Sequence, residues 1–255
     1  MGTVSAIDTA SVRNHISEAE WKVRVELAAC YRLVALDGWT DLTATHISGR
    51  VPGEDAFLLN PSDLYFEEIT ASSLVKMDYD RNIVLDNGKY FNPAAFTIHS
   101  AILGGRPDAV CALHTHTRAG MAVSAMKCGL LPITQHALRF YNRLGYHKYE
   151  GIALDPDEKA RLIADLGPNE AMILENHGLA TVGVTIGDAY EAMFYLEKSC
   201  QSQLDAMTSG TELILPDSEV CEHAAKQYES YSSYQDKDWA AAMRRAYRES
   251  PGFDR

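Results

Sequence analysis

Apolar residues recur along the chain with two different spacings, which predict a mixture of helices and strands. After Ser17, apolar positions follow one another every three or four residues, as on one face of an amphipathic helix. Ser17 is a favourable N-cap residue for this helix, and Glu20 lies three residues later at the capping-box position. Gly38 follows the last apolar turn, where glycine commonly ends a helix. We therefore expect a long helix between Ser17 and Gly38.

Shorter apolar runs after this helix predict further strands and helices. The expected strands are at 43–48, 56–59, 75–80, 82–85, 109–113, 133–137, 171–174 and 179–184. The expected helices are at 70–74, 93–103, 119–127, 158–166, 187–207 and 239–247, and a polar loop is expected at 146–151. Because strands and helices interleave without strict alternation, we predict a three-layer α/β/α domain rather than a doubly wound parallel sheet.

The chain is expected to contain one large domain with a short addition at each end. A length of 255 residues lies at the upper end of what one domain usually holds. We assign residues 1–16 to an N-terminal tail and residues 17–208 to the domain. Residues 209–255 are expected to form a helical appendage that packs on the domain or on a neighbouring subunit.

Charge and cysteine content exclude several classes of protein. The net charge of −12 argues against binding to nucleic acid or to anionic membrane surfaces. The five cysteines are scattered and contain no Cys-x-x-Cys pair, as is usual in a reducing compartment. We see neither a signal-peptide core nor an apolar run of 18 residues, so we expect a cytoplasmic protein without a membrane span.

Three histidines each follow an apolar run that predicts a buried strand. His114 and His116 come directly after the run 109–113, and side chains two residues apart along a strand point the same way. His177 comes after the run 171–174 and is followed by a glycine. Three converging imidazoles can hold a divalent transition metal and leave coordination positions open for a substrate. The sequence therefore predicts one metal ion per chain.

Several motifs in the same order resemble the class II aldolase/adducin family. Residues 38–48 and 60–70 resemble the two substrate loops of that family, and residues 101–128 and 171–183 resemble its metal-binding core. The resemblance covers about residues 17–208. It implies a central, mostly antiparallel sheet flanked by helices, and a ring-like homotetramer with sites near the subunit interfaces. It also implies that His114, His116 and His177 bind the metal, most commonly zinc, with manganese or iron as alternatives.

The motifs depart from those of the sugar-phosphate aldolases at positions that matter for chemistry. Ala95 stands where those enzymes carry an acid/base glutamate, and His99 is a candidate substitute. The first loop offers Thr45, His46 and Ser48 for substrate binding instead of a Gly-Asn-x-Ser sequence.

The second substrate loop also departs from the family pattern. It offers Pro61 and Ser62, followed by Asp63 where those aldolases have glycine. A carboxylate is unfavourable beside a phosphate that backbone amides should bind. We therefore expect a small substrate without a phosphate group.

Four further residues are candidates for the site. Arg118 follows the predicted metal-binding strand and could bind a substrate carboxylate, or pair with an acidic residue across a subunit contact. Glu68 could serve as a base, or could be a charge at the start of a helix. In this family a tyrosine from the neighbouring subunit often protonates an intermediate, and Tyr141 or Tyr146 could take that role.

These observations favour a metal-dependent lyase that cleaves a carbon–carbon bond in a hydroxy-carbonyl compound or hydroxy acid, by decarboxylation or retro-aldol reaction. One alternative is a ferrous-iron oxygenase that performs oxidative decarboxylation, as in relatives from aminocoumarin antibiotic pathways. Another is a non-catalytic binding module like the adducin head domains, which lack the metal ligands. A serine-triad hydrolase and a nucleotide-binding enzyme are disfavoured, because the chain contains no Gly-x-Ser-x-Gly, P-loop or Gly-x-Gly-x-x-Gly motif.

Overall fold

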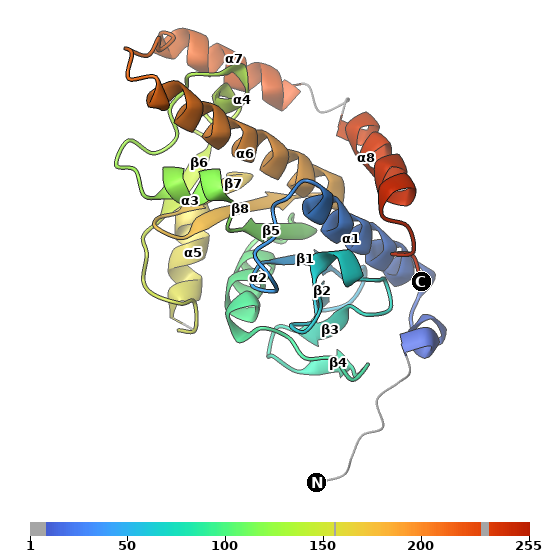
Figure 1. The fold of residues 1–255 in the computed structure, drawn as a ribbon. Helices are drawn as coiled ribbons and strands as arrows, with labels where there is room; N and C mark the ends of the chain where they lie inside the picture. The colour runs from blue at the N-terminus through green and yellow to red at the C-terminus, as the bar shows by residue number, and fades with distance from the viewer. Residues whose placement is uncertain (1–8, 156, 231–234) are drawn as a thin grey trace.

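The computed structural model describes residues 9–155, 157–230 and 235–255, and it is built around one eight-stranded sheet. The strand order is β4-β3-β2-β1-β5-β8-β7-β6, and every neighbouring pair is antiparallel except β6 with β7. Helices α1, α3, α6 and α8 lie over one face and helices α2 and α5 over the other (Figure 1). The predicted three-layer α/β/α domain with a mostly antiparallel sheet is therefore confirmed.

The strands are short and the helices that cover them are longer. The strands are β1 (His46–Arg50), β2 (Ala56–Leu59), β3 (Val75–Asp78), β4 (Ile83–Leu85), β5 (Cys111–Thr115), β6 (Leu144–His147), β7 (Ala171–Leu174) and β8 (Gly178–Gly183). The helices are α1 (Glu18–Leu36), α2 (Pro93–Gly105), α3 (Arg118–Ser124), α4 (Gln135–Leu138), α5 (Glu158–Leu166), α6 (Ile186–Thr208), α7 (Ser218–Ser230) and α8 (Gln235–Glu249). Two 3-10 helices, η1 (Thr9–His15) and η2 (Phe66–Glu68), complete the described elements.

Helix α1 begins and ends where the sequence predicts. The Ser17 hydroxyl accepts the backbone N–H of Glu20 at 3.1 Å, and Gly38 follows the helix with a φ of 73°. The carboxylate of Glu20 does not complete a capping box, because it pairs with two buried cations. These are Arg24 at 2.8 Å and Lys76 of β3 at 2.7 Å, so the pairing fastens α1 to the sheet.

Three predicted elements differ from the structure. Residues 70–74 form a turn and not a helix, because the Ser73 hydroxyl both accepts the N–H and donates to the carbonyl of Thr70. Residues 133–137 were expected to be a strand but contain the start of α4, which the Thr134 hydroxyl caps at Ala137. The expected loop at 146–151 begins inside β6. This strand forms because it pairs with β7, a segment distant in the sequence.

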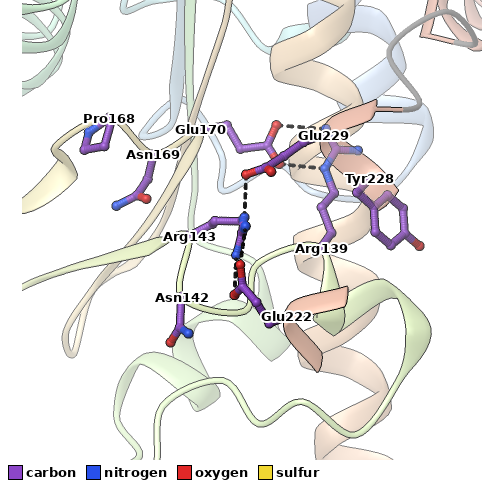
Figure 2. Close-up of a pocket in the computed structure, with 9 residues that line it drawn as sticks. All are labelled: Arg139, Asn142, Arg143, Pro168, Asn169, Glu170, Glu222, Tyr228 and Glu229. Atoms are coloured by element: carbon purple, nitrogen blue, oxygen red, sulfur yellow. Dashed lines mark hydrogen bonds and ion pairs between the residues drawn. The ribbon is translucent and has the colours of Figure 1, made fainter. Parts of the chain in front are cut away.

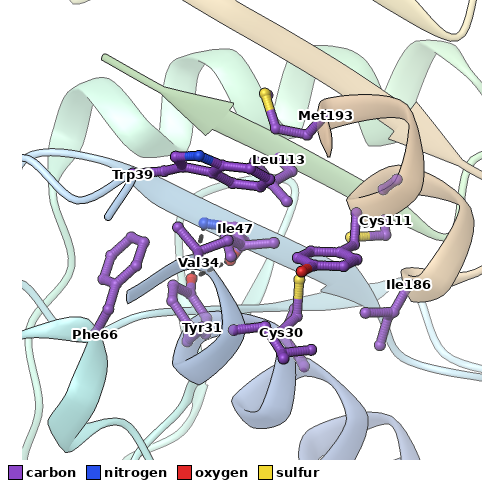
Figure 3. Close-up of a cluster of buried hydrophobic side chains, with 14 of the residues drawn as sticks. Cys30, Tyr31, Val34, Trp39, Ile47, Phe66, Cys111, Leu113, Ile186 and Met193 are labelled. Carbon is purple, nitrogen blue, oxygen red and sulfur yellow. Dashed lines mark hydrogen bonds between the residues drawn. The ribbon is translucent and has the colours of Figure 1, made fainter. Parts of the chain in front are cut away.

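The sheet separates two buried clusters, and successive side chains along each strand alternate between them. Ile47 and Leu113 belong to the cluster under α1 and α6, together with Trp39 and Met193 (Figure 3). Ala112 belongs to the cluster under α2 and α5. The same alternation places His46, Ser48 and His114 on the α2 side of the sheet.

The ends of the chain return to the domain. Helix α8 packs on α1 and α6, and the buried Phe253 accepts a backbone hydrogen bond from Ala71 at 2.7 Å. Helix α7 contacts α4 (Figure 1). Val12 of η1 is buried, and residues 1–8 of the expected tail lie outside the described residues. Among the described helices, none combines the length and apolar character needed to cross a bilayer.

Candidate metal centre

Three histidines from separate places in the sequence meet at one end of the central strands. His114 is on β5, His116 follows that strand, and His177 lies in the turn between β7 and β8. The Nε2 atom of His116 is 2.9 Å from the Nε2 atom of His114 and 2.9 Å from that of His177. This is the one histidine, cysteine or carboxylate cluster within the described ranges whose atoms could share a metal ion.

In two of these rings, the hydrogen bond made by Nδ1 determines whether Nε2 carries a proton. Nδ1 of His114 is 2.9 Å from the carbonyl oxygen of Leu179, and Nδ1 of His116 is 2.9 Å from a carboxylate oxygen of Asp41. Both partners only accept hydrogen bonds, so each Nδ1 must carry the proton. In the neutral rings the two Nε2 lone pairs then face each other, and a cation between them would relieve this repulsion.

Burial keeps the imidazoles of His114 and His177 neutral. Desolvation lowers the pKa of His114 well below its ordinary value, and the nearby histidines lower it further. Desolvation and the neighbouring His116 lower the pKa of His177 to about 4. Neutral imidazole is the form that binds metals, so these residues fit a divalent transition metal near neutral pH.

The turn that carries His177 depends on its two neighbours. Asn176 has a φ of 55°, a left-handed conformation that asparagine tolerates better than most residues, and its N–H donates to Ser124 at 3.0 Å. Gly178 lies so close to the carbonyl of Thr115 that any Cβ there would overlap with that oxygen. The backbone thus fixes where the imidazole of His177 lies relative to β5.

A second line of buried polar groups runs from α2 to the metal centre. The Ser48 hydroxyl hydrogen-bonds to Nδ1 of His99, and Nε2 of His99 is 2.7 Å from Nδ1 of His46. His46 pairs with His114 across β1 and β5, with ring centroids 5.0 Å apart. Burial lowers the pKa of His99 to about 3 and that of His46 well below its ordinary value, so both rings are neutral.

The first predicted substrate loop therefore lies beside the histidines, but its side chains are not equally available. Ser48 and His99 are engaged with each other and with His46. Thr45 is fully buried, and within the described part of the chain its hydroxyl has no hydrogen-bond partner. Ala95 lies one helical turn before His99 on α2, where its methyl group is buried.

The second predicted loop and Glu68 make mainly local contacts. Pro61 is buried, and the Ser62 N–H donates to the carbonyl of Tyr90 at 2.8 Å. Asp63 points outward and forms an ion pair with Lys89 at 3.0 Å. Glu68 accepts the backbone N–H of Tyr65 at 2.8 Å and so caps η2. The catalytic role of Glu68 stays a prediction.

Arg118 and the predicted tyrosines differ in how they are used. Arg118 begins α3, is exposed, and forms no ion pair with any residue that the structure describes. The Tyr146 hydroxyl accepts the N–H of Leu130 at 3.0 Å, and Tyr141 lies half-buried in the turn before β6. Tyr149 lies closest to the cluster, with its ring centroid 6.4 Å from that of His177.

Asp41 and Tyr149 lie at the site but are not among the residues predicted from the sequence. Asp41 lies in a loop before β1, and its carboxylate contacts His116, which is 75 residues later in the sequence. Tyr149 was one of several tyrosines in a polar segment. Asp41 lies in the segment 38–48 that resembles a substrate loop, but no local pattern indicates its contact with His116 or the position of Tyr149. Strand pairing between distant segments brings both residues to the site.

A separate cleft of about 570 Å³ lies near α7 and is lined by charged groups that pair with each other (Figure 2). Arg139 is paired with Glu170 at 2.6 Å, and Arg143 is paired with Glu222 at 2.9 Å and with Glu229 at 2.6 Å. None of the three clustered histidines lines this cleft. The two pairs of Arg143 connect the domain to α7, and none of these ion pairs is part of the metal centre.

Comparison with known proteins identifies the family. Residues 25–204 match the family model described as the class II aldolase and adducin N-terminal domain. A protein of Caulobacter vibrioides, provisionally named a class 2 aldolase, is 45% identical over 97% of this chain and 98% of its own length. Rat alpha-adducin is 45% identical over 75% of this chain, but the match covers only 26% of that longer protein.

Solved structures agree with this assignment. An aldolase II superfamily protein from Pseudomonas syringae is 48% identical, covers 96% of this chain and 99% of its own, and superposes with a TM-score of 0.90. L-fuculose 1-phosphate aldolase from Glaciozyma antarctica is 28% identical, covers 91% of this chain and 92% of its own, and superposes with a TM-score of 0.80. Since the family model spans most of the chain and whole-length relatives share nearly half of its residues, the chain belongs to the class II aldolase and adducin family.

Proposed function

We propose that this protein is a metal-dependent lyase that cleaves a carbon–carbon bond in a small hydroxy-carbonyl compound or hydroxy acid, by decarboxylation or retro-aldol reaction. The observation that carries the proposal is the cluster of three imidazoles, two of which have their outer nitrogens committed as donors. His114, His116 and His177 would hold one divalent transition metal, with zinc the expected ion and manganese or iron the alternatives. When bound, such a metal polarises a carbonyl or carboxylate oxygen and withdraws electrons from the bond that breaks.

The chain's own residues would orient the substrate and the ligands. Asp41 keeps the proton of His116 on Nδ1, which leaves Nε2 free to bind. Arg118, exposed two residues after His116, is available to bind a substrate carboxylate through two parallel hydrogen bonds. Thr45 supplies a buried hydroxyl without a partner among the described residues. A bound hydroxy acid would give Arg118 the partner it lacks, and it could reach the fully buried Thr45 hydroxyl only if the loop moved.

Proton transfer requires a different route from that of an aldolase with a glutamate at the position of Ala95. Both ring nitrogens of His99 are hydrogen-bonded, so any proton that His99 gives or takes must pass through His46 or Ser48. His99 is therefore proposed as a positioning residue for His46. Tyr149, whose ring centroid lies 6.4 Å from that of His177, is a further candidate proton donor beside Tyr141 and Tyr146.

We propose a substrate without a phosphate group, on the basis of the first loop and not of the second. Asp63 is neutralised by Lys89 and points outward, so its charge does not by itself oppose a phosphate. The support comes instead from the first loop, where His46 and Ser48 are held toward His99 by hydrogen bonds. Side chains engaged in this way leave less room for a phosphate than a loop of small residues would.

We further propose that the protein assembles as a homotetramer with the sites near subunit interfaces. This arrangement would allow Tyr141 or Tyr146 of a neighbouring copy to complete the site. The exposed Arg118 would then have to be available to the substrate and not be paired across the interface.

The test is elemental analysis of the full chain purified without added metal, alongside His116→Ala. We expect about one transition metal per chain in the wild type, and binding weakened by roughly a hundredfold or more in the variant, because one of three protein ligands is removed. His223→Ala is the matched control, since His223 is exposed on α7 and should leave the metal content unchanged. Wild-type protein that stays empty when offered zinc, manganese and iron would overturn the proposal.

The reaction is tested with the metal-loaded chain on two panels of compounds, hydroxy acids and sugar phosphates, with release of carbon dioxide and of aldehyde as the readouts. We expect turnover with the first panel, and loss of it in His116→Ala. Oxygen consumption that requires ferrous iron would assign the oxygenase instead. A loaded protein that turns over neither panel would favour a binding module like the adducin domains.

A further inference from the structure

A small aromatic cavity lies between α6 and α8, and none of the clustered histidines lines it. Its walls are the rings of Tyr190, Phe194, Tyr195 and Trp239, together with the carboxylates of Glu191 and Asp238. The cavity measures about 240 Å³. We propose that it binds a small organic cation, such as an alkylammonium or guanidinium compound.

The rings form rigid walls. Trp239 of α8 and Tyr190 of α6 have centroids 5.9 Å apart and planes inclined by 56°. The Tyr190 hydroxyl donates to Asp37 at 2.6 Å, and Trp39 packs against Tyr190 with a centroid distance of 5.9 Å. Tyr190 is thus held in place before any ligand arrives, so binding would not have to order it.

Gly187 explains how Trp239 comes so close to α6. A Cβ atom at Gly187 would lie only 2.7 Å from Cγ of Trp239, so any other residue would push the indole outward. Gly187 lies in the first turn of α6, where the helix itself does not need glycine. The close approach sets the width of the cavity between the two helices.

The chemistry of the walls selects a cation. The negative face of an aromatic ring attracts a cation placed over it. Every charged residue that lines the cavity, Glu191 and Asp238, is acidic. Burial raises the pKa of Glu191, the ion pair with Arg139 opposes this rise, and the nearby charge of Asp238 adds to it. Burial also raises the pKa of Tyr195, and the charges of Glu191 and Asp238 raise it further. No residue that lines the cavity carries a positive charge that could bind an anion.

The cations already present do not fill these positions. Arg139 lies 5.2 Å from the centroid of Tyr195, but it is paired with Glu170 and Glu191. Lys198 lies 5.9 Å from the centroid of Phe194. Within the described ranges, no cation lies over Tyr190 or Trp239, and no ion pair is formed by Asp238. Because Tyr190 is buried and its hydroxyl is engaged, the Trp239 ring and the Asp238 carboxylate are the groups most accessible to a ligand.

The volume limits the ligand. Pockets for drug-sized molecules begin near about 300 Å³, so a cavity of about 240 Å³ suits a compact headgroup. The net charge of −12 would also raise the local concentration of cations around the protein. A methylated ammonium ion fits both conditions.

The test is a titration of the full chain with tetramethylammonium chloride, followed by calorimetry and by saturation-transfer NMR. The neutral control is tert-butanol, which has nearly the same shape, and sodium chloride controls for ionic strength. We expect saturable binding of tetramethylammonium that is at least about tenfold tighter than that of tert-butanol, because the ring faces and carboxylates act only on the charge. Equal binding of the two probes would overturn the proposal.

Two variants locate the site. Asp238→Asn changes an exposed side chain and is expected to weaken binding by about fivefold, and Trp239→Leu by about tenfold or more. Asp205→Asn, the same charge change at an exposed position of α6, should leave binding within about twofold. Unchanged binding in both site variants would refute the assignment. Thermal unfolding establishes that Trp239→Leu is folded, and Asp238→Asn decides the matter if it is not.

Discussion

The histidine cluster and helix α7 are held in place by different forces. His114, His116 and His177 are fixed by strand pairing, backbone hydrogen bonds and a tight approach at Gly178. Helix α7 contacts α4 and is tied to the domain by ion pairs that Arg143 forms with two glutamates. The first region is specified by main-chain geometry, whereas the second depends on side chains that are partly exposed to solvent.

The difference suggests how each region responds to change. A buried, backbone-determined site cannot relax around an added atom, so small substitutions there have large effects. An exposed ion pair is weakened by salt and its loss is partly compensated by water. The following predictions test this contrast, from the largest expected effect to the smallest.

The largest effect is expected from Gly178→Ala. The added Cβ would overlap with the carbonyl oxygen of Thr115, so either β8 or the turn that carries His177 must move. We expect metal affinity to fall by about a hundredfold or more, because a ligand displaced by about 1 Å no longer reaches the ion. The measurement is a competition titration with a zinc chelator.

Gly104→Ala is the matched control for this experiment. A Cβ at Gly104 would lie 3.5 Å from Tyr79, which is an ordinary contact. Metal affinity should be unchanged in this variant. If Gly178→Ala binds metal as tightly as Gly104→Ala, the backbone does not determine the site.

A smaller effect is expected from Asp41→Asn. The asparagine side chain keeps the shape of Asp41 but can turn its amide toward Nδ1 of His116, which would then accept and leave the proton on Nε2. Metal affinity should fall by about 10- to 100-fold. Asp55→Asn, the same change at an exposed position outside the site, should have no effect. An affinity that is the same in both variants would remove Asp41 from the site.

The buried histidine His99 predicts a dependence of stability on pH. Burial lowers its pKa to about 3, whereas the unfolded chain has a histidine pKa near 6.5. Between these values the unfolded state binds a proton that the folded state does not, so stability falls as pH falls. For this one group the free energy of unfolding should decrease by about 1.5 kcal/mol between pH 6.5 and pH 5.

Urea denaturation of metal-free protein at the two pH values measures this change. His99→Gln removes the titrating group, so the loss of stability on acidification should be smaller than in the wild type by about that amount. His223→Ala removes an exposed histidine and should leave the loss as it is in the wild type. Equal losses in all three proteins would show that His99 is not buried as a neutral ring.

The regular elements of the domain could be predicted because their own residues specify them. The apolar spacing and caps of α1, and the runs that form β2, α5 and β8, carry the signal locally. The turn at 70–74 could not be predicted as a turn, since the carbonyl of Phe253 takes one of its N–H groups and a serine takes another. The strand β6 depends on β7 in the same way.

The candidate site could be predicted only as far as its motifs reach. His114, His116 and His177 each end an apolar run, so their convergence follows from strand order and the family resemblance. Asp41, Tyr149 and the contact of His99 with His46 could not be predicted, because they arise where distant segments meet. Sequence patterns locate groups along an element, whereas their partners depend on the register between elements.

The smallest effect is expected from Arg143→Gln, which removes the ion pairs of α7. Arg143 pairs with Glu222 through two hydrogen bonds of 2.9 Å and with Glu229 at 2.6 Å, and these pairs lower the pKa of both carboxyls. Because both glutamates are at least partly exposed to solvent, we expect only about a two- to fivefold faster cleavage of the 209–217 segment in limited proteolysis. Raising the salt concentration should speed cleavage of the wild type toward the rate of the variant. Arg161 lies on α5, and Arg161→Gln removes its comparable ion pair with Glu150, which should not change cleavage at 209–217. Metal content should be the same in both variants, and a loss of metal in Arg143→Gln would mean that α7 and the histidine cluster are not independent.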